Sequence, residues 1–183
     1  MNTGNSGGYM SVAQKFASCL VVLVLLLAGC AGQVTQSTEA PKPEVRSLRN
    51  VSLEMSPKVV KKIANDVEFD IGVFKSVLME ALNSRQLLAS DGDFDLNVVI
   101  NEVRIRSTGS AVLFGFLAGD DHVTGEAIVL DRKGEAVYTY NANASYALGG
   151  FGGSDDTTRI NWLYKKFSEI VSDELVEKRD TKE

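Results

Sequence analysis

Cysteine and histidine are nearly absent from this chain of 183 residues, which contains two cysteines and one histidine. A zinc site built from such side chains needs about four ligands close together. A nucleophile–histidine–acid site would have to bring Ser110 together with His122 and with Asp120 or Asp121, and no recognisable nucleophile motif surrounds these residues. The scarcity argues against a histidine–cysteine metal centre, and we expect the protein not to be an enzyme.

Positive charge is also in short supply. The chain has 19 lysines and arginines against 24 aspartates and glutamates, which gives a formal net charge of −5. Proteins that bind nucleic acid present strongly basic faces to the phosphates. We therefore expect no nucleic-acid partner.

No hydrophobic run is long enough to span a membrane. The apolar run from Phe16 to Gly29 falls short of the roughly 20 residues that a spanning helix needs. It matches the apolar core of an export signal, about 7–15 residues long, with Lys15 as the preceding basic residue and Ala28 among the small residues at the cleavage site. The alternatives are an uncleaved signal anchor and ordinary cleavage that leaves Cys30 unmodified.

The signal ends in residues 27–30 (LAGC), which resemble the lipobox of bacterial lipoproteins. The resemblance implies cleavage between Gly29 and Cys30 and attachment of lipid to Cys30, and two or more acyl chains give stable anchoring. Ala31 stands where an aspartate would favour inner-membrane retention in Gram-negative sorting. We therefore expect an envelope protein anchored to the outer membrane and facing the periplasm. Cys19 would leave with the signal, so the mature chain could form no internal disulfide.

Proline is rare, and two of the three prolines lie in the polar segment from Ala31 to Pro43. Such a segment is typical of a tether rather than of a folded element. The remaining length suits one domain with one core. The expected organisation is a signal peptide at 1–29, a lipidated cysteine and flexible tether at 30–43, one globular domain at 44–179 and a frayed tail at 180–183.

Alternating apolar residues predict four strands, at 45–55, 94–106, 122–130 and 135–147. The alternation changes parity within 94–106, which predicts a bulge near Asn101 and Glu102. Helical spacing predicts two main helices over 69–89 and 156–178, and Ser56 followed by Pro57 indicates a short helix before them. The order strand–helix–strand–strand–strand–helix predicts an α+β domain. It would hold an antiparallel sheet of about four strands with the two main helices on one face.

The segment 107–121 is unusual for a connection between strands. It carries bulky apolar residues, among them Phe114, Phe116 and Leu117, where connections are usually short and polar. One interpretation is that the segment folds back over the core or extends the flanking strands. The other is an exposed apolar patch that meets a partner or a lipid.

One face of the strand 135–147 carries tyrosines, including Tyr138 and Tyr140. This face could form part of a ligand or partner surface. Faces of this kind more often pack against a helix. Both interpretations stay open at this point.

The acidic run at 91–95 does not predict a calcium site. Asp91, Asp93 and Asp95 alternate as in an EF-hand, but the glycine stands at Gly92 and the twelfth position, Glu102, lies in a predicted strand. The glycine-rich run at 149–153 lacks the lysine and hydroxyl residue that complete a phosphate-binding loop. We expect no metal and no cofactor apart from the lipid on Cys30.

The segment from Gly109 to Gly119, the hairpin turn with Asp131 and Gly134, and the run at 149–153 together resemble domain-of-unknown-function family 4410, an uncharacterised family of bacterial lipoproteins. The resemblance covers about 45–176 and implies location and fold only. The pattern is also similar to small envelope lipoprotein domains that assist export machines. Two functions follow as hypotheses. The first is a non-catalytic binding or assembly module with an envelope protein partner. The second is a carrier or accessory subunit that binds a lipid or hydrophobic small molecule.

Overall fold

The structure is a computed structural model of the chain, and it describes residues 32–37, 42–63, 69–106, 119–146 and 155–176. Three helices and five strands make up this part of the chain. The strands are β1 (Gly32–Gln36), β2 (Leu48–Met55), β3 (Phe94–Arg104), β4 (Asp121–Leu130) and β5 (Ala136–Tyr146). The helices are α2 (Pro57–Ile63), α3 (Ile71–Ser84) and α5 (Asp156–Val176). The predicted α+β class is confirmed.

The sheet has five strands in the order β1-β5-β4-β3-β2 and is mixed, so the expectation of about four antiparallel strands is wrong in detail. β3, β4 and β5 form an antiparallel meander, whereas β2 pairs in parallel with β3. The chain passes through α2 and α3 between β2 and β3, and such a crossover returns it in its original direction. The pattern of alternation in each strand carries no information about the direction of its neighbour.

Part of the expected tether is folded. Gly32–Gln36 was expected to hold no folded element, but it forms β1 and pairs with the edge of β5. All five residues are exposed, so the strand lacks the buried apolar face that sequence patterns detect. Main-chain hydrogen bonds to an open sheet edge need no particular side chains.

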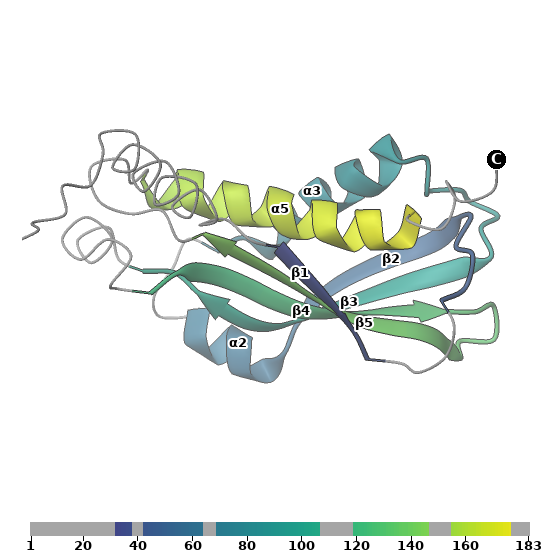
Figure 1. Cartoon of the computed structure of the whole chain (residues 1–183), viewed down its shortest axis with the longest axis horizontal. Coiled ribbons are helices and arrows are strands. Elements are labelled where there is room, and N and C mark those ends of the chain that lie inside the picture. Colours follow the sequence, from purple (N-terminus) through teal and green to yellow (C-terminus); the bar gives the residue numbers. More distant parts are fainter. Residues whose placement is uncertain (1–31, 38–41, 64–68, 107–118, 147–154, 177–183) are drawn as a thin grey trace, which may run out of the picture.

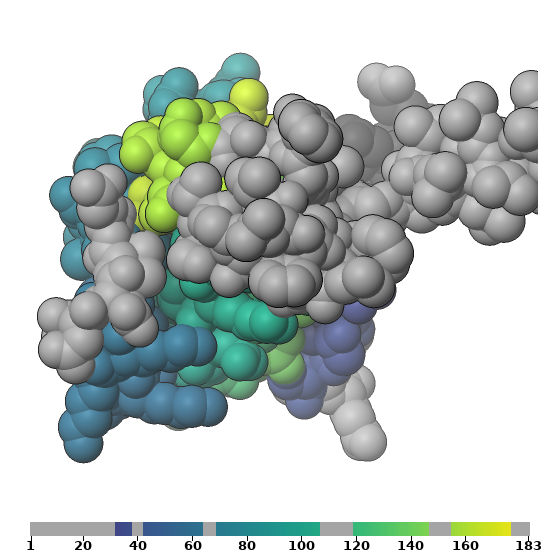
Figure 2. All heavy atoms as spheres, turned by 90° about the vertical axis from the view of Figure 1, so that its left-hand side faces the viewer, coloured from purple at the N-terminus to yellow at the C-terminus, as the bar shows by residue number. Residues whose placement is uncertain are grey.

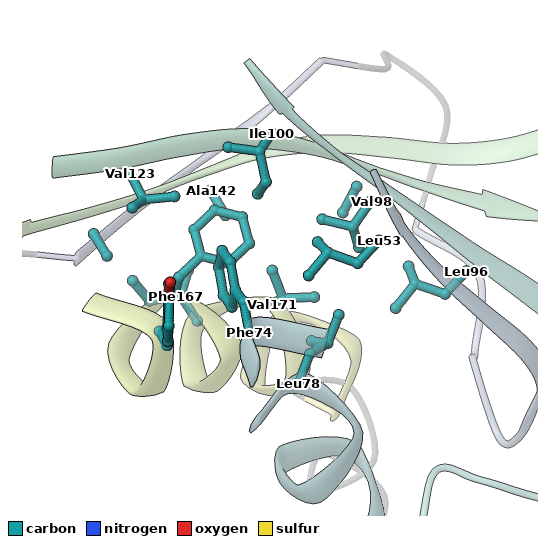
Figure 3. Packing of buried hydrophobic residues seen from close by; sticks show 14 of the residues in the cluster. Leu53, Phe74, Leu78, Leu96, Val98, Ile100, Val123, Ala142, Phe167 and Val171 are labelled. Atoms are coloured by element: carbon teal, nitrogen blue, oxygen red, sulfur yellow. The ribbon is translucent and has the colours of Figure 1, made fainter. Parts of the chain in front are cut away.

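The two main helices, α3 and α5, cover one face of the sheet as predicted, and α2 lies on the opposite side (Figure 1). The apolar core fills the space between α3, α5 and the sheet, and Figure 3 shows Phe74 and Phe167 on the helix side of the core and Ile100 above them on the sheet. The predicted bulge is confirmed, because the register shifts between Ile100 and Glu102. The extra residue returns Val103 to the buried face, where it pairs with Val123.

Helix α3 begins at Asp70, whose side chain accepts hydrogen bonds from the amides of Gly72 and Val73 at 2.7 and 3.1 Å. An aspartate in this position satisfies amides that the first helical turn cannot pair, and it suits the positive end of the helix dipole. The amide of Asp70 itself donates to the hydroxyl of Tyr164 on α5 over 2.8 Å. The start of α3 is thereby held against α5.

Candidate functional site

Three charged side chains are buried together at one end of the sheet. Asp121 and Arg159 have no exposed surface, and Arg106 is 5% exposed. Asp121 accepts from the main-chain amide of Arg106 over 2.6 Å and from its Nε over 3.1 Å. The other carboxylate oxygen lies 2.8 Å from Nε of Arg159. We call Arg106, Asp121 and Arg159 the buried ion cluster.

The buried ion cluster connects the ends of three strands and one helix. Arg106 donates through Nη1 to the carbonyl of Gly119 over 2.6 Å and through Nη2 to the carbonyl of Tyr146 over 3.3 Å. Arg159 donates to the carbonyl of Arg106 over 2.6 Å and to Asp156 over 2.8 Å. These residues flank the segments 107–118 and 147–154, so the cluster holds together the points where both segments leave the fold. We call this end of the domain the loop end.

Burial makes the cluster costly to break. A charge removed from water loses several kcal/mol of hydration, and the attraction of its partners offsets that loss only while all of them are present. Two guanidinium groups share Asp121, and Asp156 gives Arg159 a second carboxylate. The arrangement suits holding the strand ends and the start of α5 together more than catalysis, because a guanidinium group only donates hydrogen bonds and offers no acceptor.

The buried ion cluster was not predicted from the sequence. Two signals in the pattern point to it. Asp121 has the same parity in β4 as the buried Val123, and Arg159 lies four residues before the buried Leu163, on the same side of α5. A charged residue on a buried face needs a charged partner, so both positions indicate an internal ion pair.

His122 lies on the outer face of the sheet, between two carboxylates. Its Nδ1 is 3.3 Å from Asp120, and its Nε2 is 3.6 Å from Glu102. The hydroxyl of Ser145 donates to Asp120 and not to His122. Burial alone would raise the pKa of Asp120, but the hydrogen bonds from Ser145 and His122 lower it below its usual value. Ser145 and His122 therefore form no relay with each other, and Ser110 lies outside the described residues.

Tyr138 and Tyr140 are both fully buried, so they form no part of an exposed partner surface. The Tyr138 hydroxyl donates to Glu174 on α5 over 2.6 Å, and the Tyr140 hydroxyl donates to the carbonyl of Val171 over 2.8 Å. Burial, with the charge of Glu174 adding to it, raises the pKa of Tyr140 well above 10. The tyrosine face packs against a helix, which is the commoner of the two interpretations.

The segment that leads into β2 is tied to the same helix. The ammonium of Lys42 lies 3.1 Å from Glu174, and both side chains are less than a tenth exposed. Glu174 therefore forms an ion pair with Lys42 and also accepts the hydrogen bond from Tyr138. This contact and β1 bring residues of the expected tether into the folded domain.

The remaining candidate residues lie elsewhere. Gly29, Cys30, Phe114, Phe116 and Leu117 are outside the described residues. In the acidic run, Asp95 pairs with Arg49 over 2.6 Å and Asp93 with Arg132 over 3.0 Å, so these two carboxylates turn toward different arginines. Of the helices in the described ranges, none has the length and hydropathy required to cross a bilayer.

No family model matches this chain, and no curated protein matches it. The resemblance to domain-of-unknown-function family 4410 therefore stays a prediction. Three solved structures are similar in part. A PelC dodecamer from Paraburkholderia phytofirmans has a TM-score of 0.44 and 12% identity, over 78% of this chain and 98% of that chain. A PDZ domain protein from Parabacteroides distasonis has a TM-score of 0.40 and 8% identity, over 93% of this chain and 42% of that chain.

The third similar structure is a minor lipoprotein from Acinetobacter baumannii, with a TM-score of 0.34 and 17% identity, over 70% of this chain and 90% of that chain. At these TM-scores and identities, the three likenesses carry no argument about the activity or partners of this chain.

Proposed function

We propose that this protein is a lipid-anchored, non-catalytic binding or assembly module of the bacterial cell envelope, which presents its loop end to the membrane and to an envelope partner. The carrying observation is the position of β1. Gly32 pairs with Ala144, two residues before β5 ends at Tyr146. The first residue of the folded domain therefore lies at the loop end.

The proposed lipid on Cys30 is close to β1 along the chain. Cys30 precedes Gly32 by two residues, and extended chain spans at most about 3.3–3.6 Å per residue. Cys30 therefore lies within about 7 Å of Gly32. A lipid on Cys30 would hold the loop end, where Arg106 and Gly119 flank the apolar segment 107–118, close to the bilayer. Ala31, in place of an aspartate, supports anchoring in the outer membrane with the domain in the periplasm.

The contacts of His122 and Ser145 support the non-catalytic part of the proposal. The alternative, a carrier of hydrophobic small molecules, would need space beside Tyr138, Tyr140 and Phe74. All three side chains have no exposed surface. Phe74 stacks on the ring of Tyr164 with 4.5 Å between the ring centres, and both tyrosine hydroxyls already have protein acceptors. We therefore favour the binding module.

The test is Cys30→Ala, with globomycin treatment of the unaltered chain as a second arm. For Cys30→Ala the expected result is loss of lipid, failure of cleavage before residue 30 and altered membrane fractionation. Globomycin should block the cleavage and the acylation that follows it, because the Cys30 thiol is lipidated before the signal is cut. Cys19→Ala is the matched control, because it removes the other thiol and should change none of these. Normal processing and fractionation of Cys30→Ala would refute the proposed anchor.

A further inference from the structure

The short helix α2 carries a compact group of lysines. Lys58, Lys61 and Lys62 are all exposed, whereas Val59 between them is buried. Residues three and four positions apart share one side of a helix. The three lysines therefore share one exposed side of α2, next to the buried Val59. We call these three residues the α2 lysines.

The sheet topology places α2 near the loop end. β2 runs parallel to β3, and its last residue, Met55, pairs with Ile100. From that point β3 continues to Arg104 at the loop end, and α2 packs along β3. The view onto this end shows α2 at the lower left, the start of α5 above and β1 at the right (Figure 2). The α2 lysines therefore belong to the side of the domain on which Gly32 lies.

Several described carboxylates near this end have partners. Glu102 and Asp120 face His122, Asp156 pairs with Arg159, and Asp155 accepts hydrogen bonds from the amide and hydroxyl of Thr158. The exposed Glu54, near the end of β2, takes part in none of these contacts. In the ranges that the structure describes, the α2 lysines take part in no ion pair. The α2 lysines therefore present positive charge to the solvent, although the net charge of the protein is negative.

We propose that the α2 lysines bind the headgroups of anionic phospholipids in the leaflet that holds the Cys30 lipid. This inference rests on the proposed function, because the anchor supplies the orientation. Each lysine close to an anionic membrane surface strengthens binding to that surface about fivefold. The anchor and α2 then contact the same surface at separate points, since β1 and β2 form opposite edges of the sheet. Two separated contacts restrict how the domain tilts on the membrane.

The experiment measures how near α2 comes to the bilayer in the lipidated full chain. Lys61→Cys carries a fluorophore, and Cys30 is blocked by its lipid. The protein is reconstituted into phosphatidylcholine vesicles with or without phosphatidylglycerol, each containing a lipid with a nitroxide quencher on its headgroup. The expected result is stronger quenching with phosphatidylglycerol. Salt should remove the difference, because the screening length falls from about 10 Å at 0.1 M to about 3 Å at 1 M.

The charge variants complete the test. Adding Lys58→Gln and Lys62→Gln should shift the balance between docked and undocked domain about fivefold for each lysine removed. The matched control adds Arg132→Gln and Lys133→Gln at the opposite end of the sheet, where β4 ends at Leu130. It removes the same charge and should leave quenching unchanged. A fluorophore at Lys133→Cys should be quenched weakly in both kinds of vesicle.

The inference is overturned if quenching at position 61 is the same with and without phosphatidylglycerol, or if the Lys58 and Lys62 variants quench like the control pair. Vesicle flotation separates this failure from failure of the proposed function. A chain that does not float has no anchor, which refutes the proposed function. A chain that floats without charge-dependent quenching refutes the lipid contact of α2 alone.

Discussion

At the scale of single residues, Asp121 has the most demanding position in the described fold. Its carboxylate meets two buried guanidinium groups and the amide of Arg106. Asp121→Asn keeps the shape and removes the charge, which leaves two buried arginines without this counter-ion. We expect a loss of about 3–5 kcal/mol in the free energy of unfolding, measured by denaturant titration.

The control for this prediction is Asp173→Asn, which breaks an ion pair between Arg85 and an aspartate that is 66% exposed. Exposed pairs contribute about 0–1 kcal/mol, so this variant should remain close to the parent protein. Equal losses for the two substitutions would show that burial of the Asp121 cluster has no energetic consequence.

Two tyrosines predict a loss of stability at alkaline pH. Burial raises the pKa of Tyr164 to about 12, although the hydrogen bond from the Asp70 amide opposes the shift, and burial also raises the pKa of Tyr140. Above pH about 10 the unfolded chain releases tyrosine protons that the folded chain keeps. The unfolded state then binds fewer protons, so stability falls as the pH rises.

For Tyr164 this fall should extend from pH about 10 to about 12, the interval between its unfolded and folded pKa values. The measurement is the free energy of unfolding against pH for the parent protein and for Tyr164→Phe. The variant should lose stability less steeply in this interval. Identical slopes would contradict the raised pKa.

At the scale of elements, β1 is held by main-chain hydrogen bonds that a proline can remove selectively. The Ser37 amide donates to the carbonyl of Thr139, and antiparallel pairs alternate in their bonding. Thr35, paired with Asn141, therefore directs its amide toward β5, whereas the Gln36 amide points to the open edge. Thr35→Pro should release β1, and Gln36→Pro should be tolerated.

Hydrogen exchange at β5 measures this difference. The amides of Asn141 and Asn143 face β1, and the amides of Tyr140 and Ala142 face β4. Thr35→Pro should accelerate exchange at the first two residues only. Unchanged exchange in that variant would show that residues 32–36 do not pair with β5 in solution.

The contact between β4 and α5 depends on Gly125. A Cβ atom there would lie 2.9 Å from Cζ of Phe167 and 2.9 Å from the carbonyl oxygen of Val99. Gly125→Ala should therefore lower the free energy of unfolding by about 1–3 kcal/mol through overpacking. Gly134→Asn is the control, because a Cβ at that turn meets nothing within 4 Å and asparagine tolerates its positive φ of 82°. Similar losses in both variants would contradict the close packing.

At the scale of the whole molecule, the loop end contains the buried ion cluster and the residues that flank the segments 107–118 and 147–154. The proposed anchor and the α2 lysines lie on the same side of the domain. Phe114→Asp combined with Phe116→Asp tests the role of the segment 107–118. If this segment meets a partner or lipid, the double variant should keep its unfolding free energy and lose cross-linking to the envelope partner or binding to liposomes. Loss of stability with binding retained would assign the two phenylalanines to the core instead.

Much of the fold was predictable because it depends on local periodicity. The predicted strands at 94–106, 122–130 and 135–147, the two main helices and the bulge beside Glu102 all follow from which residues alternate or recur. The parallel pairing of β2, the exposed strand β1 and the buried ion cluster were not predicted. These features depend on pairing between residues far apart in the chain, and Arg106 meets Arg159 only after the sheet and α5 have come together.

The amino-acid sequence alone determined the period of the apolar residues, which sets the α+β class, and the apolar run that ends in residues 27–30, which sets the expectation of an anchor at Cys30. The tertiary structure alone decided which end of the domain Gly32 adjoins. The reason is physical. An edge strand such as β1 forms because the main-chain groups at the edge of β5 are free to pair with it. Its own side chains are exposed, so their sequence pattern does not predict the pairing.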